Sequence, residues 1–159
     1  MSRRSLFLDR DGVLNADTGY VHRASDFVVL PGVYDALRRA LALDYDLVVV
    51  TNQSGIGRAL FTAAEYAALE AHMVQLFARE GITFAGIYHC AHHPAAGCAC
   101  RKPAPGMILR AAHDHGIDLS RSIMVGDKPS DAAAARAAGI GRVELVAPGR
   151  GLSEIVAGL

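Results

Sequence analysis

Short runs of aliphatic and β-branched residues alternate with longer stretches of helical periodicity along the chain, and this alternation restricts the possible folds more than any other feature. Turn residues bound each short run, as expected of strands that are buried on both faces of a sheet. The five predicted strands cover residues 5–9, 47–50, 86–90, 122–125 and 142–146.

Between these runs, apolar residues recur at the spacing of a helix. The clearest helix start is Thr62-Ala-Ala-Glu65, a capping box, and the pattern that follows it stops at Gly81. The predicted helices cover residues 33–43, 62–80, 106–115, 130–138 and 152–159. Residues 92–105 fit neither pattern and form an insertion rich in Cys, Pro, Gly and Ala.

This order of elements predicts an α/β fold, in which one open, mostly parallel, Rossmann-like sheet carries helices on both faces. A chain of 159 residues suits a single domain spanning residues 1–159. In such sheets the functional site lies beyond the carboxyl ends of the strands. The residues that follow each predicted strand are therefore the candidates for function.

Composition excludes several classes of protein. Lys and Arg total 16, and so do Asp and Glu, whereas a protein that coats nucleic acid usually carries a basic excess. The longest aliphatic run, residues 47–50, is far shorter than a membrane span. The apolar residues after Arg3 and Arg4 end at Asp9, which excludes a signal peptide. We expect a cytoplasmic monomer without a nucleic-acid or membrane partner.

Two acids, Asp9 and Asp11, end the first predicted strand and precede Gly12. Residues i and i+2 of an extended segment point to the same side, so both carboxylates can face one pocket. Two solvated acids on a surface loop would give the same pattern. The apolar residues just before Asp9 favour a buried strand end, where a carboxylate without a partner would destabilise the fold.

Polar groups follow two further strands. After residues 47–50 come Thr51, Asn52, Gln53 and Ser54, whose hydroxyl and amide groups are neutral donors suited to phosphate oxygens, or to a polar turn. After residues 122–125 come Gly126 and Asp127.

Asp127 would be a third carboxylate at the same sheet edge. Three acids there would repel one another unless a cation lay among them, and oxygen ligands with room for water favour Mg²⁺. Asp131 is a candidate cap for the following helix. Lys102, in the insertion, could offset the charge of an acid and of a phosphoryl group, although Arg101 and Lys102 also fit solvated surface charge.

Three cysteines and two histidines fall within residues 90–100, from the end of the third predicted strand into the insertion. Three thiolates and one imidazole can close a tetrahedral Zn²⁺ site, which leaves no open position and is therefore structural. We predict the ligands Cys90, His92, Cys98 and Cys100, with His93 as the rival of His92. The alternative is a reduced, metal-free cysteine loop.

The four motifs together resemble the haloacid dehalogenase (HAD) superfamily of phosphatases over residues 5–146. The resemblance implies that Asp9 attacks phosphorus and that Asp11 is general acid and then general base. It implies that Thr51 and Lys102 hold the phosphoryl group. The implied Mg²⁺ ligands are the Asp9 carboxylate, the Asp11 main-chain carbonyl and Asp127.

The cysteine loop and three longer runs, residues 7–15, 51–57 and 100–107, are similar to the D-glycero-D-manno-heptose-1,7-bisphosphate 7-phosphatase family. This resemblance implies a minimal cap domain, partly replaced by the zinc loop, and a small phosphorylated sugar as substrate. The implied substrate contacts are Asp17, Thr18, Gly19, Tyr20, Asn52, Gln53, Ser54, Arg101 and Lys128.

Other functions remain open from the sequence. The histidinol-phosphate phosphatase family shares the zinc loop, and the five residues between His92 and Cys98 are nearer its spacing. A non-catalytic binding protein that keeps the zinc would share the loop too. A phosphatase that processes nucleic-acid ends is disfavoured by the neutral charge and by the lack of tryptophan.

Overall fold

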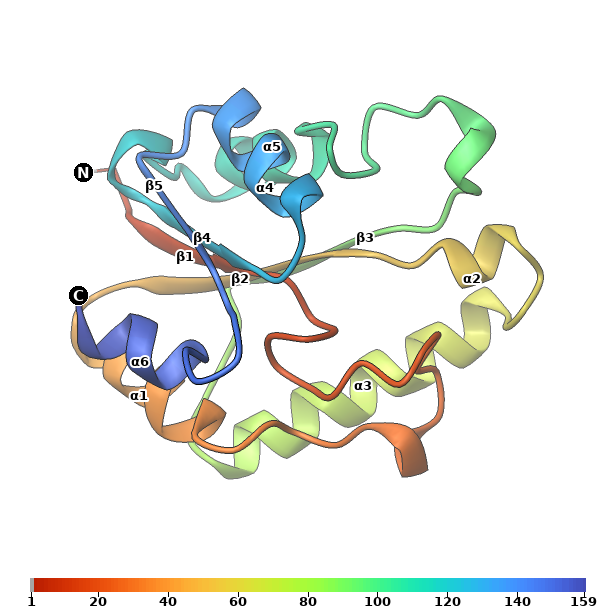
Figure 1. Cartoon of the computed structure of the whole chain (residues 1–159), viewed down its shortest axis with the longest axis horizontal. Helices are drawn as coiled ribbons and strands as arrows, with labels where there is room; N and C mark the ends of the chain where they lie inside the picture. Colours follow the sequence, from red (N-terminus) through yellow and green to blue (C-terminus); the bar gives the residue numbers. More distant parts are fainter. Residues whose placement is uncertain (1) are drawn as a thin grey trace.

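All five predicted strands are present in the computed structural model, which describes residues 2–159, and they form one parallel sheet (Figure 1). The strand order is β3-β2-β1-β4-β5. The strands are β1 (Ser5–Leu8), β2 (Asp46–Asn52), β3 (Gly86–Cys90), β4 (Ile123–Gly126) and β5 (Arg142–Leu145). The predicted open, parallel sheet is therefore confirmed.

Helices cover both faces of this sheet, as predicted. In Figure 1, α4 and α5 lie above the sheet, and α1, α3 and α6 lie below it. The helices are α1 (Val33–Ala42), α2 (Ser54–Gly57), α3 (Ala63–Arg79), α4 (Gly106–His115), α5 (Pro129–Ala138) and α6 (Leu152–Ala157). Three single-turn 3₁₀ helices complete the chain: η1 (Ala24–Asp26), η2 (Pro94–Ala96) and η3 (Leu119–Arg121).

The central strand shows why its sequence is continuously apolar. Leu6 and Leu8 pack with α1, α3 and α6 on one face, while Phe7 packs with α4 and α5 on the other. All three side chains are fully buried. A strand covered on both faces has no polar side to present to water, so apolar and polar residues do not alternate along it.

The capping box predicted at the start of α3 forms as expected. The Thr62 hydroxyl accepts a hydrogen bond from the Glu65 N–H at 3.0 Å, and the Glu65 carboxylate accepts one from the Thr62 N–H at 3.0 Å. In contrast, α2 was not predicted, because Gly55 and Gly57 within four residues are typical of a turn. These glycines allow close packing: a Cβ on Gly55 would lie 2.1 Å from Phe61, and one on Gly57 would lie 2.4 Å from the His93 nitrogen.

The chain reverses its direction across the sheet at β1. It passes from β1 to β2 and β3 on one side, and then returns to β4 and β5 on the other. The crevice at such a switch point is the usual ligand site of an open α/β sheet. The loops after β1 and β4 meet there, with the Asp9 N–H donating to the Val125 carbonyl at 3.0 Å. Within residues 2–159, none of the helices has both the length and the apolar character of a membrane span.

Candidate active site

A buried lysine lies between two carboxylates at the switch point. The Lys102 ammonium donates to Asp9 Oδ1 at 3.0 Å and to the Val50 carbonyl at 2.8 Å, and it lies 2.6 Å from Asp131 Oδ1. Lys102 is only 4% exposed. A buried charge requires partners of opposite charge, and here three oxygens surround the ammonium. The structure thus brings the predicted Asp9 and Lys102 into direct contact.

The main chain of Lys102 is fixed by the end of β2. The Lys102 N–H donates to Asn52 Oδ1 at 3.0 Å, and Asn52 Nδ2 donates to the Lys102 carbonyl at 3.2 Å. One amide side chain therefore holds both sides of this residue. Holding Lys102 is thus a structural role for Asn52 that needs no ligand. Asn52 also lines the cleft described below.

Burial dominates the electrostatics of the site. It raises the pKa of Asp9 to about 7, with Lys102 opposing the rise and Asp131 adding to it. Burial also acts to lower the pKa of Lys102, but attraction to Asp9 and Asp131 outweighs it and raises that pKa overall. Burial likewise raises the pKa of Asp127. The site thus holds more carboxylates than the buried Lys102 neutralises.

Three of these carboxylates form a candidate metal centre. Oxygens of Asp9, Asp127 and Asp131 lie within 4.8 Å of one another. Asp127 Oδ1 is buried without a hydrogen-bond partner among residues 2–159, which fits an oxygen that ligates a cation. Gly12 leaves room for this carboxylate, since a Cβ there would lie 2.3 Å from Asp127 Oδ2. An all-oxygen donor set of this kind suits Mg²⁺.

Asp131 has two roles that the sequence only partly predicted. Its Oδ2 accepts from the N–H groups of Asp127 and Lys128 at 3.0 and 3.1 Å, which is the helix-capping alternative considered above. Its Oδ1 pairs with Lys102. The second role was not predicted, because nothing in the sequence indicates that the insertion folds back onto α5.

Asp11 lies beside this centre in a different environment. Its Oδ1 accepts from Asn15 Nδ2 at 2.9 Å and from the Arg10 guanidinium, whereas its Oδ2 accepts from Gln53 Nε2 at 3.3 Å. Gln53 Nε2 also donates to the Thr51 hydroxyl at 3.0 Å, and Thr51 is buried. Asp11 and Thr51 are thus connected through Gln53.

A cleft of about 510 Å³ opens beside these residues. Four cationic side chains line it: Arg58, Arg101, Lys102 and Lys128. A smaller pocket, lined by Asp9, Asp11 and Lys102 among others, shares residues with the cleft and connects it to the carboxylates. The arrangement suits an anionic ligand whose reacting end reaches Asp9.

The cleft contains eight of the nine predicted substrate contacts. Those that line it are Asp17, Gly19, Tyr20, Asn52, Gln53, Ser54, Arg101 and Lys128, whereas Thr18 is exposed and does not line it. One nitrogen of Arg101, Nη1, is buried without a hydrogen-bond partner among residues 2–159, as expected of a donor whose acceptor is a ligand. Arg58 was not predicted, although it directly follows the polar turn after β2.

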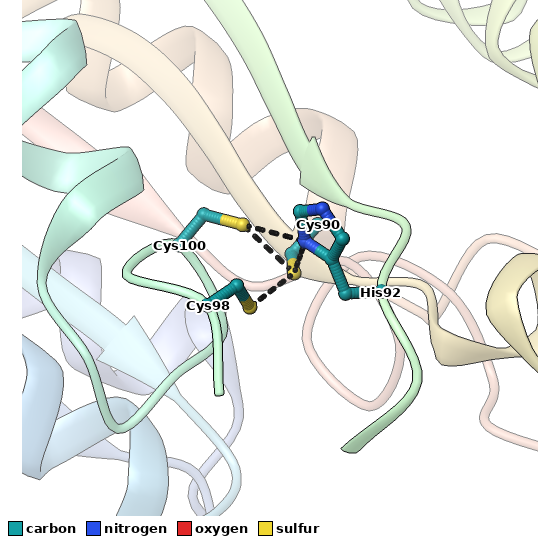
Figure 2. Close-up of side chains that lie close together, drawn as sticks. All are labelled: Cys90, His92, Cys98 and Cys100. Carbon is teal, nitrogen blue, oxygen red and sulfur yellow. Dashed lines mark hydrogen bonds between the residues drawn. The ribbon is translucent and has the colours of Figure 1, made fainter. Parts of the chain in front are cut away.

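The predicted zinc ligands converge between the end of β3 and the insertion that follows it (Figure 2). Cys90 Sγ lies 3.0 Å from Cys100 Sγ, 3.6 Å from Cys98 Sγ and 3.4 Å from His92 Nδ1. In a tetrahedral zinc site with Zn–S bonds of about 2.3 Å, the sulfurs would lie about 3.8 Å apart. The four donors therefore need to separate only slightly to hold Zn²⁺.

His93 lies outside this cluster. Its Nδ1 accepts a hydrogen bond from the Ala95 N–H at 3.0 Å and caps η2. All three cysteines are free thiols. Although burial opposes it, hydrogen bonds from the Arg101 N–H and from the other two sulfurs lower the pKa of the Cys98 thiol to about 6. Arg101 directly follows Cys100, the last residue of the cluster.

Comparison with known proteins agrees with this geometry. The profile of HAD-hydrolase-like proteins matches residues 99–156. The D-glycero-beta-D-manno-heptose-1,7-bisphosphate 7-phosphatase of Vibrio cholerae is 45% identical over 161 residues, covering 97% of this chain and 87% of that protein. The D-glycero-alpha-D-manno-heptose-1,7-bisphosphate 7-phosphatase of Burkholderia mallei is also 45% identical, over 92% of this chain and 81% of that protein.

Solved structures show the same relationship. The D,D-heptose 1,7-bisphosphate phosphatase from B. bronchiseptica, complexed with magnesium and phosphate, superposes with a TM-score of 0.89. It is 31% identical, and the match covers 98% of this chain and 97% of that one. The corresponding enzyme from Burkholderia thailandensis gives a TM-score of 0.68 at 26% identity over 98% of this chain and 97% of that one.

Proposed function

Since the chain belongs to the D-glycero-D-manno-heptose-1,7-bisphosphate 7-phosphatase family of HAD phosphatases, we propose that it hydrolyses the 7-phosphate of D-glycero-D-manno-heptose 1,7-bisphosphate. The observation that carries this proposal is the contact of Lys102 with Asp9 at the carboxyl end of β1, beside Asp127. A carboxylate next to a cation can attack phosphorus.

Asp9 is the nucleophile in this proposal. A carboxylate oxygen of Asp9 forms a bond to phosphorus while the bond from phosphorus to the C7 oxygen breaks, which leaves an aspartyl-phosphate. A carboxylate and a phosphate monoester repel each other unless positive charge offsets both. The Lys102 ammonium, 3.0 Å from Asp9 Oδ1, supplies part of that charge, and the Thr51 hydroxyl at the end of β2 is a further donor for the phosphoryl group.

Asp11 is the general acid and then the general base. Its Oδ1 already accepts from three N–H groups, so a proton on this carboxyl lies on Oδ2. Oδ2 gives this proton to the departing C7 oxygen, and it then takes a proton from the water that attacks the aspartyl-phosphate. Inorganic phosphate leaves, and Asp9 and Asp11 return to their starting states.

The residues of the chain fit the two metals that the sequence predicted. Asp9, Asp127 and the main-chain carbonyl of Asp11 would hold Mg²⁺, and the partnerless Asp127 Oδ1 supports this assignment. When bound, Mg²⁺ supplies positive charge that offsets the nucleophile and the phosphoryl group.

A structural Zn²⁺ would be held by Cys90, His92, Cys98 and Cys100, and the short distances among their donor atoms support this set. Free thiols in this loop also agree with the reducing cytoplasm that we propose as the site of action.

The cleft supports a small, doubly phosphorylated sugar as the substrate. One phosphate would react at Asp9, and Arg58, Arg101 and Lys128 would face the rest of the molecule. The amides of Asn52 and Gln53 and the hydroxyl of Ser54 suit sugar hydroxyls. The relatives include enzymes named for each anomer, so both anomers belong in the test.

The decisive experiment measures phosphate release from both anomers of heptose 1,7-bisphosphate and from histidinol phosphate in the presence of Mg²⁺. We expect kcat/KM to be highest for one heptose anomer. Asp9→Asn should reduce it at least ~10³-fold without changing the fold, because the amide is a poor nucleophile. Preference for histidinol phosphate would refute the substrate assignment, and turnover by Asp9→Asn within tenfold of wild type would refute the nucleophile.

A further inference from the structure

Arg10 is a buried charge to which the mechanism above gives no role of its own. It lies between Asp9 and Asp11, it is only 2% exposed, and it is among the largest fully buried side chains of the chain. A guanidinium in such a place destabilises the fold unless it is fully hydrogen-bonded. The contacts of Arg10 therefore indicate why a buried arginine is present.

Two of those contacts are with one oxygen of Asp11. Arg10 Nε and Nη2 donate to Asp11 Oδ1 at 3.0 and 2.9 Å. Asn15 Nδ2 donates to the same oxygen at 2.9 Å. Among residues 2–159, Oδ2 has a single side-chain donor, Gln53 Nε2 at the longer distance of 3.3 Å. The two guanidinium donors and Asn15 thus hold Oδ1 in place, which leaves Oδ2 as the reacting oxygen of the carboxyl.

The remaining contact ties the same guanidinium to the substrate cleft. Arg10 Nη2 donates to the Val21 carbonyl at 2.8 Å. Val21 directly follows the residues that line one wall of the cleft, including Asp17 and Tyr20. The Arg10 guanidinium carbon also lies 6.0 Å from the centre of the Phe27 ring. The Arg10 side chain therefore positions both the Asp11 carboxyl and the segment before Val21 that lines the cleft.

We propose that Arg10 is a positioning residue that holds the Asp11 carboxyl with Oδ2 directed at the leaving oxygen of the substrate. This inference rests on the proposed function, because it needs Asp11 to act as the general acid. The rigid spacing of the arginine donors is essential to it, since lysine would supply the charge without holding Oδ1 and the Val21 carbonyl at the same time.

The leaving group of the substrate provides the test. Departure of a sugar oxygen needs a proton from Asp11, whereas p-nitrophenolate departs as a stable anion and needs almost none. We compare kcat/KM for heptose 1,7-bisphosphate and for p-nitrophenyl phosphate, because kcat/KM reports only the steps through the first phosphoryl transfer. A variant that misorients the acid should lose activity selectively on the sugar phosphate.

For Arg10→Lys we expect kcat/KM to fall about 10²-fold on the sugar phosphate and less than about threefold on p-nitrophenyl phosphate, within the usual range for general acid catalysis. Asp11→Asn gives the full selective loss for reference. Arg38→Lys is the matched control, because Arg38 also joins two acceptors, Asp35 and Glu80, but lies on the surface of α1. It should change neither value.

Equal losses on the two substrates, or no loss on either, would overturn the positioning role. If Arg10→Lys does not fold, Arg10→Gln, which buries no charge, is measured in the same way against the same two outcomes. A wild-type protein without activity on any phosphate ester would instead refute the proposed function itself, and with it this inference.

Discussion

The contact between Gly12 and Asp127 allows a sharp test of the metal centre. Gly12 has φ = +86°, and a Cβ at this position would lie 2.3 Å from Asp127 Oδ2 and 2.8 Å from its Cγ. Contacts between Cβ atoms and oxygens below 3.0 Å are essentially absent from proteins, so Gly12→Ala must displace the carboxylate by about 1 Å. A displacement of this size can cost about 10²-fold in rate when it affects catalytic geometry.

The control separates this contact from backbone strain. Gly81 also has a positive φ, +74°, but a Cβ there would meet nothing within 4 Å. Both alanine variants should lose about 1–2 kcal/mol of stability from left-handed backbone. For a chain of this size that loss lowers Tm by about 2–8 °C.

Thermal melts and Mg²⁺ titrations of kcat/KM on both variants distinguish the two effects. We expect Gly81→Ala to keep wild-type activity. Gly12→Ala should lose about 10²-fold at low Mg²⁺ and need at least ~10-fold more Mg²⁺ for half-maximal activity. Superimposable Mg²⁺ titrations of the two variants would show that Asp127 is not a ligand that Gly12 accommodates.

Two further predictions concern the metals. Because burial raises the pKa of Asp9 to about 7 and a protonated carboxyl is a poor ligand, the Kd for Mg²⁺ measured by calorimetry should rise about tenfold from pH 8 to pH 6. A Kd independent of pH over this range would exclude Asp9 as a ligand that must lose a proton. Elemental analysis should find one zinc per chain in wild type and in His93→Ala, and less in His92→Ala, since only His92 reaches the thiols. Zinc retention that depended on His93 instead would contradict the ligand set.

The helices and strands were predictable from the sequence because the spacing of apolar residues reflects which faces of each element are buried. Continuous apolar residues such as Leu6–Leu8 mark a strand covered on both faces, and Thr62 with Glu65 marks the start of α3. The strand order was not predictable in the same way, since alternation of strands and helices fits several orders. The single turn of α2 was missed because Gly55 and Gly57 serve close packing, which only the tertiary structure reveals.

The site was predictable where its residues follow strands and was missed where they depend on contacts between distant segments. Asp9 and Asp127 each follow a strand, and parallel strands bring their carboxyl ends to one edge. The pairing of Asp131 with Lys102 and the fork of Arg10 on Asp11 depend on side-chain geometry that no local pattern records. The catalytic and metal-binding roles of all these residues stay predictions until the variants are assayed.

The cysteine–histidine cluster and the end of β2 support neighbouring residues in different ways. Asn52 and Cys90 are partners in the β2–β3 register. Asn52 holds both main-chain groups of Lys102, whose ammonium is also fixed by Asp9 and Asp131. Arg101 has fewer contacts: its carbonyl accepts from the Ala104 N–H at 2.7 Å, its Nη1 is buried without a partner among residues 2–159, and it directly follows Cys100 of the cluster. Lys102 is therefore held by the sheet, whereas Arg101 is held by the cysteine loop.

This difference predicts what removal of the proposed zinc does to catalysis. Cys90 is the one proposed zinc ligand inside a buried core cluster, whose other members come mainly from the sheet, α4 and α5. The zinc-free protein should therefore stay folded, as circular dichroism would report. Lys102 keeps its contacts with Asn52 and the carboxylates, so kcat should change less than about threefold. Arg101 loses its anchor, and losing a hydrogen bond from a charged group costs about 1.5–3 kcal/mol, which corresponds to a rise in KM of roughly 10- to 150-fold. A zinc-free protein whose kcat falls while KM stays constant would show that the loop positions Lys102, and not Arg101, against the substrate.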